Sequence, residues 1–425
     1  MPATADARAG RAAFTHPAFV LFQIARFLIV LAVEMQAVAV GWQVYEITKR
    51  PLDLGFVGLA QFLPAIVLFP ISGHASDRFE RRKVLSTCYA GFGVCFALLL
   101  VLAHRGMHSV AAIYVVLILL GVVRSFNGTA SRSILPQLVP EQDFPNAVAW
   151  NATTFQASTI LGPAVGGILY AAFHGPSVVY AIAMLTAIGA TVSTFRIKPE
   201  VKARPREPMT FKTVFAGLRY IWSKKLILGA ISLDLFAVLL GGAVALLPVY
   251  AREILHTGPW GLGLLRTAPG VGAALMAVLL AHRPLRGRSG LTLLWAVAGF
   301  GVFTIIFGLS RSLAVSLIAL LLLGASDMIS VIIRATLTQL ATPDEMRGRV
   351  TAVDMIFIGT SNEFGQFESG VTAQWFGTVT AVVLGGIGTL VVIAVWAWLF
   401  PELRHAGELT AINSSGETPA SGDAA

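Results

Sequence analysis

Long apolar stretches alternate with short polar segments along most of the chain. A membrane-spanning helix needs about 20 consecutive apolar residues. About twelve stretches of this kind occur, at 19–45, 53–73, 84–103, 110–135, 146–172, 177–195, 226–253, 260–281, 291–309, 312–339, 350–376 and 379–400. The pattern predicts an all-α polytopic membrane protein with twelve transmembrane helices.

One long polar interruption, residues 196–225, divides the apolar stretches into two sets of six. Within it, the spacing of Phe211, Phe215, Leu218 and Trp222 predicts a short amphipathic helix on the membrane surface. The end of the chain is rich in Ser, Gly, Ala and Thr and is expected to be disordered. The expected organisation is an N-terminal segment 1–18, a six-helix bundle 19–195, a central loop 196–225, a second bundle 226–400 and a tail 401–425.

The two halves share a weak internal repeat. Residues 132–138 align with 334–340, matching an arginine, a glutamine and two leucines, and Gly58-Leu59 aligns with Gly263-Leu264. The offsets, 202 and 205, are similar, as a duplicated bundle with slightly different loops would give. Apolar sequences also produce chance identities, but the repeat favours two bundles of one origin.

Composition and charge distribution agree with a membrane location. The chain is 56% hydrophobic and 12% charged, with net charge +9, whereas soluble domains carry about 25% charged residues. The Lys and Arg residues concentrate in 78–83, 196–225, 283–288 and 347–349, which are alternate loops of one side. This positive-inside bias predicts cytoplasmic N- and C-termini and accounts for the basicity without nucleic acid. Cys88 and Cys95, seven apart on one expected helix, are interpreted as packing residues.

A dense charged segment separates the second and third apolar stretches. We call residues 73–83 the gate loop; its candidate residues are Gly73, Asp77, Arg78, Arg81, Arg82 and Lys83. Its sequence resembles the signature loop of the major facilitator superfamily, G-x-x-x-D-R-x-G-R-R-K, with Glu80 in place of the second glycine. The resemblance implies that Asp77 faces the N-terminus of the eleventh span, where a helix dipole favours an anion. The alternative is that the cluster only fixes topology.

Further segments resemble the same superfamily. Residues 120–130 resemble its second motif, in which a buried arginine, here Arg124, is linked to proton coupling. Gly162, Pro163, Gly166 and Gly167 resemble the G-P-x-x-G-G signature of the antiporter branch and are candidates for a helix-packing hinge, or for ordinary close packing. Segments at 16–19, 25–28, 77–84, 216–220, 342–350 and 402–405 resemble the enterobactin exporter family, which also has a glutamate at the position of Glu80. This resemblance, which covers about 16–405, implies parallel repeats with a substrate site at their interface.

Charged side chains inside membrane spans are costly and often functional. The candidates for proton or substrate binding are Glu34, Arg26, Arg124, Asp234, Glu363 and Glu368. For Glu34 the alternative is a structural ion pair with an arginine, and Glu363 and Glu368 are spaced so that both are not expected to face one cavity. Asp327 and Arg334, seven apart, are positioned to pair with each other. An alternative to a functional role exists for three of the arginines. They would lie at helix ends and extend their charged groups toward water, and they are Arg26, Arg266 and Arg334.

These features favour a secondary transporter over an enzyme. The sequence has no G-x-x-x-x-G-K-[ST] phosphate loop and no H-E-x-x-H or G-x-S-x-G motif, and its soluble loops are too short for a catalytic domain. The first hypothesis is proton-coupled export of a small organic compound, a siderophore or an amphipathic drug, with Glu34 as proton carrier and Arg124 as the cation that tunes it. The alternatives are an importer or lipid flipper of the same fold, and a membrane sensor that has lost transport. The expected partners are the substrate, protons and the bilayer of a bacterial plasma membrane, with no cofactor or metal and with one chain sufficient for a pathway.

Overall fold

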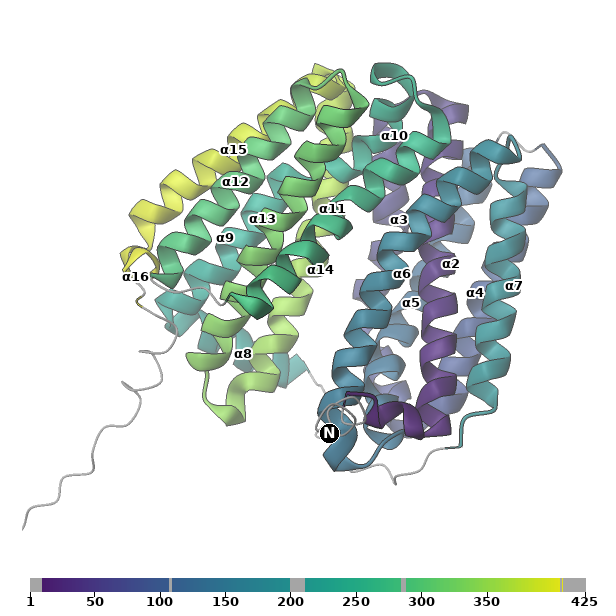
Figure 1. The fold of residues 1–425 in the computed structure, drawn as a ribbon, viewed down its shortest axis with the longest axis horizontal. Helices are drawn as coiled ribbons and strands as arrows, with labels where there is room; N and C mark the ends of the chain where they lie inside the picture. Colours follow the sequence, from purple (N-terminus) through teal and green to yellow (C-terminus); the bar gives the residue numbers. More distant parts are fainter. Residues whose placement is uncertain (1–9, 107–108, 199–210, 284–287, 406, 408–425) are drawn as a thin grey trace, which may run out of the picture. The chain divides into compact units, whose positions relative to one another are not determined.

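The computed structural model describes residues 10–106, 109–198, 211–283, 288–405 and 407, and every regular element in these ranges is a helix (Figure 1). The ends of the expected N-terminal segment and tail, at 1–9, 406 and 408–425, lie outside the described residues. The all-α prediction is confirmed.

Helices α2 to α7 correspond to the first six apolar stretches. They are α2 (Pro17–Thr48), α3 (Pro51–Arg78), α4 (Arg81–His104), α5 (Val110–Ile134), α6 (Phe144–Ala172) and α7 (Ser177–Phe195). Proline at the first helical positions favours helix entry, and Pro17 begins α2. Lys49 ends α2 in the left-handed conformation, with φ of 53°. Helices α2, α3, α4 and α6 extend beyond their expected spans because polar terminal turns remain helical outside the apolar stretch, whereas α7 matches its expected span 177–195.

The second half contains α9 (Lys225–Gly241), α11 (Gly258–His282), α12 (Ser289–Leu309), α13 (Leu313–Leu340), α14 (Asp344–Phe376), α15 (Thr378–Leu399) and the short α16 (Pro401–Arg404). The seventh expected span, 226–253, is not one continuous α-helix. It breaks at Gly242 and continues as a 3-10 turn, Ala243–Leu246, then α10 (Leu247–Val249) and the π-helical turn Tyr250–Ile254. Such irregular turns often mark functional or strained positions.

Among the described residues, eleven helical segments have the length and hydropathy of a membrane span. Helix α14 is not one of them because its sequence is too polar, although its 33 residues extend for about 50 Å at 1.5 Å per residue. It occupies the position of the eleventh expected span, 350–376, in the chain order. The polarity of α14 therefore comes from charged residues within an otherwise spanning helix, including Asp354, Glu363 and Glu368.

The chain forms two compact units. Unit 1 contains Met1–Thr210, Val244–Gly270 and Gly370–Thr378, and unit 2 contains Phe211–Ala243, Val271–Ser369 and Val379–Ala425. Within unit 1, α2 packs on α6 and α7, α3 on α5, and α4 on α5 and α7. The π-helical turn and the first half of α11 belong to unit 1 despite coming from the second half of the sequence.

The amphipathic helix expected in the central loop is confirmed as α8 (Phe211–Ser223). In unit 2 its inner face buries Ile221, and the Tyr220 hydroxyl donates a hydrogen bond to the Ala341 carbonyl. Phe215 and Trp222 are exposed by 65% and 68% on the other face. An exposed aromatic face is what a membrane-surface helix requires.

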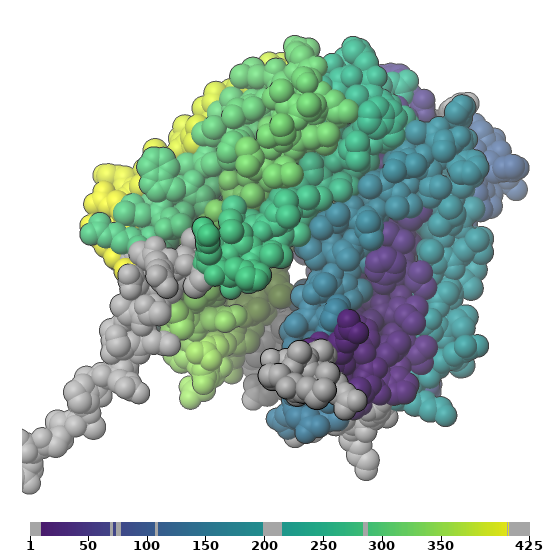
Figure 2. All heavy atoms as spheres, in the orientation of Figure 1, coloured from purple at the N-terminus to yellow at the C-terminus, as the bar shows by residue number. Residues whose placement is uncertain are grey.

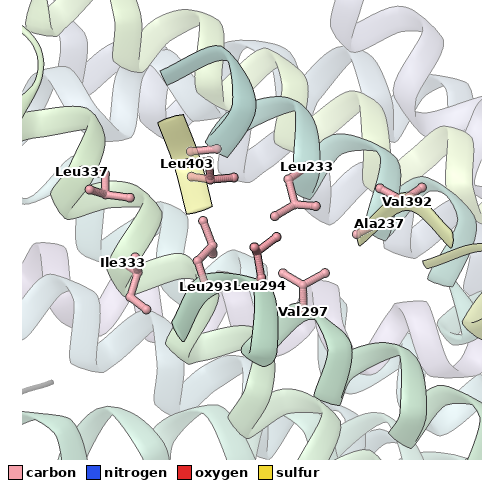
Figure 3. Close-up of a cluster of buried hydrophobic side chains, with 10 residues drawn as sticks. Leu233, Ala237, Leu293, Leu294, Val297, Ile333, Leu337, Val392 and Leu403 are labelled. Atoms are coloured by element: carbon pink, nitrogen blue, oxygen red, sulfur yellow. The ribbon is translucent and has the colours of Figure 1, made fainter. Parts of the chain in front are cut away.

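An apolar cluster forms the interior of unit 2. Leu233 and Ala237 of α9, Leu293 and Val297 of α12 and Ile333 of α13 point toward one another (Figure 3). Helix α15, at the yellow end of the colour scale, lies at the surface of the unit in Figure 2, and its Trp398 is 80% exposed. This exposed apolar surface agrees with a helix that faces lipid.

Candidate functional site

Glu34 lies in the middle of α2 where α6 approaches it most closely. A Cβ atom on Gly162 of α6 would lie 2.4 Å from the Glu34 Cβ, and one on Gly166 would lie 2.8 Å from the Met35 Cα. Contacts of this kind leave no room for a side chain on either glycine. The two glycines therefore permit the helix contact that fixes the position of Glu34.

The opposite face of the same α6 segment packs on α11, also within unit 1. A Cβ atom on Gly167 would lie 2.6 Å from the Pro259 carbonyl oxygen, and one on Gly263 would lie 2.6 Å from the Pro163 carbonyl oxygen. The Thr267 hydroxyl donates to the Ile160 carbonyl over 3.0 Å. The G-P-x-x-G-G segment thus lies between α2 and α11, and its four motif residues hold three helices together around Glu34.

Replacing Gly166 by alanine is expected to destabilise the protein by about 1–3 kcal/mol, because the new methyl group meets the backbone of α2. Thermal unfolding of the purified protein in detergent measures the effect. Gly128→Ala on α5 is a matched control, since a Cβ atom there has no neighbour within 4 Å. The control is expected to be neutral or slightly stabilising. Equal unfolding temperatures for the two variants would contradict the close-packing role.

Two arginines of unit 1 act electrostatically on the Glu34 carboxylate. The stronger effect comes from Arg266 on α11 and the weaker from Arg124 on α5. The Arg124 Nη1 atom donates to Gln61 Oε1 over 3.3 Å, where Gly121 lets α5 approach the backbone of α3. Arg124 is the cation predicted from the sequence to tune Glu34. Arg266 was expected only as a residue near a helix end, because sequence spacing does not reveal which helices meet.

Arg26 has other partners. Its Nη1 atom donates to the Ser131 hydroxyl over 2.7 Å, and its guanidinium lies over the Phe155 ring at 5.4 Å from the centroid. These contacts join α2 to α5 and α6. Arg26 therefore has structural partners even though it shares a helix with Glu34.

The gate loop is mostly helical, since α3 continues to Arg78 and α4 begins at Arg81. Arg81 donates to the Ser133 carbonyl, and Arg82 donates to the Ile197 carbonyl just beyond α7. Such bonds satisfy carbonyl groups that are left open at helix ends. The loop thereby connects α4 to the ends of α5 and α7. The side chain of Asp77 lies outside the described residues, so its expected contact with the eleventh span stays a prediction.

Glu80, the residue that departs from the superfamily pattern, pairs with Lys83 at 3.1 Å and with Arg82 at 2.9 Å. The hydrogen bond from Lys83, with Arg82 beside it, holds the pKa of Glu80 below its ordinary value. The glutamate thus binds the basic residues of the loop where the motif usually has glycine. Arg78 is exposed.

A polar network lies where α2 ends and α3 begins, in unit 1. The Tyr45 hydroxyl donates to Glu253 over 2.5 Å, and Arg252 pairs with Glu46 at 3.4 Å. Glu46 also accepts a hydrogen bond from the Tyr170 hydroxyl. This network has no signature in the sequence, because its partners are far apart in the chain, 124 residues for Glu46 and Tyr170 and 208 for Tyr45 and Glu253. It ties the π-helical turn Tyr250–Ile254 to α2.

A second charged cluster lies inside unit 2. The Arg334 Nη1 atom contacts Asp234 Oδ2 at 3.1 Å and Asp354 Oδ1 at 3.0 Å, and Arg334 is 4% exposed. The interpretation of Arg334 as a snorkelling residue is therefore wrong. Its ion pairs go to α9 and α14, not to Asp327 on its own helix, because the side chain extends between helices. Asp354 was missed because it lies close to the start of the eleventh expected span.

Glu363 and Glu368 both lie on α14. Glu363 accepts a hydrogen bond from Gln366 over 3.2 Å. Their role stays a prediction.

Comparison with known proteins places this architecture in a family. The family model described as transmembrane secretion effector, MFS_3, matches residues 9–420. The chain belongs to this family. The expected membership of the major facilitator superfamily is thereby confirmed, and the chain is a multi-pass membrane transporter.

Two relatives of this secretion-effector family member are enterobactin exporters. The enterobactin exporter EntS of Citrobacter koseri is 28% identical over 404 residues, covering 92% of this chain and 94% of the relative. The enterobactin exporter EntS of Escherichia coli K12 is 27% identical over the same shares. The expected resemblance to enterobactin exporters is confirmed.

Solved structures support the fold. A D-xylose–proton symporter has a TM-score of 0.69 at 15% identity, covering 91% of this chain and 98% of its own. A mutant form of the nucleoside transporter NupG has a TM-score of 0.68 at 13% identity, covering 90% of this chain and 100% of its own. At such identities the likeness establishes the twelve-helix fold alone.

Proposed function

We propose that the protein exports a small organic compound from a bacterial cell in exchange for protons. The observation that carries the proposal is Glu34, an ionisable carboxylate in the middle of a membrane span, placed by Gly162 and under the influence of Arg266 and Arg124. A charged group in this position requires a functional or structural reason. Siderophores and amphipathic drugs are the proposed cargo, and the relatives described as enterobactin exporters support the first class.

The mechanism follows from the change in surroundings of one carboxylate. Beside the guanidinium groups Glu34 is stabilised as an anion, whereas in a dry setting without them it binds a proton. In the proposed cycle, Glu34 takes up a proton from outside as the substrate leaves. It returns the proton inside when Arg124 and Arg266 again favour the anion. The proton gradient is the energy source, and the expected location is the plasma membrane with both termini in the cytoplasm.

The first test is substrate-induced proton release from the purified full chain in detergent, screened over siderophores and common drugs. Release by the wild type but not by Glu34→Gln supports the proposal and identifies a substrate. Binding without proton release, unchanged in Glu34→Gln, contradicts the antiport mechanism. Reconstitution into vesicles then determines direction, since inward transport or lipid movement would favour the importer or flipper alternatives.

A further inference from the structure

A small cavity lies in unit 2 next to the charged cluster. Its polar lining consists of Asp234 on α9 and of Asp327 and Ser330 on α13. Val297 and Ala237, which belong to the apolar cluster of Figure 3, form part of its remaining wall. About 10 Å³ is open to the centre of a water-sized sphere, which is the space of about one water molecule.

The charges around this cavity do not balance. Three carboxylates, Asp234, Asp327 and Asp354, surround the single guanidinium of Arg334. Arg334 contacts Asp234 and Asp354 directly, whereas Asp327 has neither a hydrogen bond nor an ion pair within the described part of the chain. Ionising all three acids would leave two uncompensated negative charges in the membrane interior.

Within the described part of the chain, Arg334 is the only cation that forms an ion pair with any of these three aspartates. Helices α12 and α15 carry no ionisable side chain. The remaining charged group of α9, Lys225, pairs with Glu402 of α16, and Arg347 of α14 pairs with Asp344. The other acids and bases of the packed elements are His282 at the end of α11, Glu345 and Arg349 in the first two turns of α14, Glu363 and Glu368 farther along α14, Arg219 on α8 and Arg404 on α16. An isolated buried carboxylate is too costly to remain ionised, so a proton or another cation must reside there.

Ser330 provides an independent indication of an occupant. It lies three residues after Asp327 on α13, is 2% exposed, and its hydroxyl has no hydrogen-bond partner among the described residues. A buried hydroxyl without a partner loses its hydrogen bonds to water. The Ser330 hydroxyl lines the cavity beside two carboxylates. It is therefore positioned to form a hydrogen bond with a group or molecule in the cavity.

We propose that this cavity is a proton-binding site in which Asp234 and Asp327 share one proton, with Ser330 as hydrogen-bond partner. Arg334 then faces two negative charges, the one left on the aspartate pair and that of Asp354, whose side chain is 21% exposed. The geometry favours a proton over a metal ion. No group of three His, Cys, Asp or Glu side chains in the described ranges is arranged to hold a metal. A dehydrated cation would need several oxygen ligands, more than a cavity of this size supplies.

The inference is independent of the cargo and direction of transport and of the role of Glu34. The two acids would bind the proton in a carrier that is not proton-driven. In a proton-driven carrier they would provide a second proton position, in unit 2.

Infrared titration of the purified full chain in detergent tests the site, because a protonated carboxyl group absorbs apart from a carboxylate. The expected result is a protonated-carboxyl band at neutral pH that corresponds to one group and is lost in Asp327→Asn. Ser330→Ala is expected to shift this band, because its hydrogen-bond partner is removed. Glu80→Gln, on an exposed carboxylate outside the cavity, is the matched control and should retain the band.

Two outcomes would overturn the proposal. One is a spectrum of Asp327→Asn that equals the wild type throughout the titration. The other is loss of the wild-type band on addition of Na⁺ at constant pH, which would indicate a metal cation. If Asp327→Asn does not fold, Asp234→Asn removes the other acid of the pair and is expected to abolish the same band. Glu34→Gln should keep the protonated-carboxyl band. Loss of proton antiport in that variant is therefore distinguishable from loss of the proton site in unit 2.

Discussion

Glu34→Gln is expected to abolish proton-driven accumulation of the substrate while leaving its downhill movement. The amide has the shape of the acid but carries neither the charge nor an exchangeable acidic proton, so the coupling step is lost. In vesicles with an imposed pH gradient, the wild type should build a substrate gradient that grows with the proton gradient. The variant should reach equal concentrations on both sides at every pH.

The matched control for this experiment is Glu402→Gln. Glu402 on α16 is an exposed carboxylate that pairs with Lys225, and exposed pairs contribute little to stability. It should retain gradient-driven accumulation. Accumulation by Glu34→Gln that still follows the pH gradient would move the coupling role to another acid, with Asp234 and Asp327 first.

Arg334→Met is expected to destabilise the protein by about 3–5 kcal/mol, because it leaves the buried Asp234 and the half-buried Asp354 without their shared counter-charge. The effect should be seen as a lowered unfolding temperature in detergent. Converting Asp234 and Asp354 to asparagine in the Arg334→Met background should recover most of the loss. The residues are in contact, so their effects are not additive.

Arg347→Met provides the comparison for Arg334→Met. Arg347 lies near the start of α14 and pairs with the exposed Asp344, so its replacement should change stability by about 0–1 kcal/mol. If Arg334→Met unfolded at the same temperature as this control, the two aspartates would already be neutral. The ion pairs of the cluster would then contribute nothing to stability.

The sequence alone determined the class of the protein. Apolar stretches of span length, the basic bias of alternate loops and the amphipathic residues 211–222 each have a direct physical cause in the bilayer. These features were therefore readable without tertiary information. The motif around Gly162 was also visible, but only as a pattern of small residues.

Only the tertiary structure decided which charged residues meet. Glu34 and Arg266 are separated by more than two hundred residues, as are Tyr45 and Glu253, and neither pair has a signature in spacing. Asp327 and Arg334 had the spacing of a pair, yet Arg334 contacts Asp234 and Asp354. Hydropathy indicates which segments of the chain are expected to lie away from water. The partner of a buried charge depends on which helices pack together and on how their faces are rotated, and that information is distributed over the whole bundle.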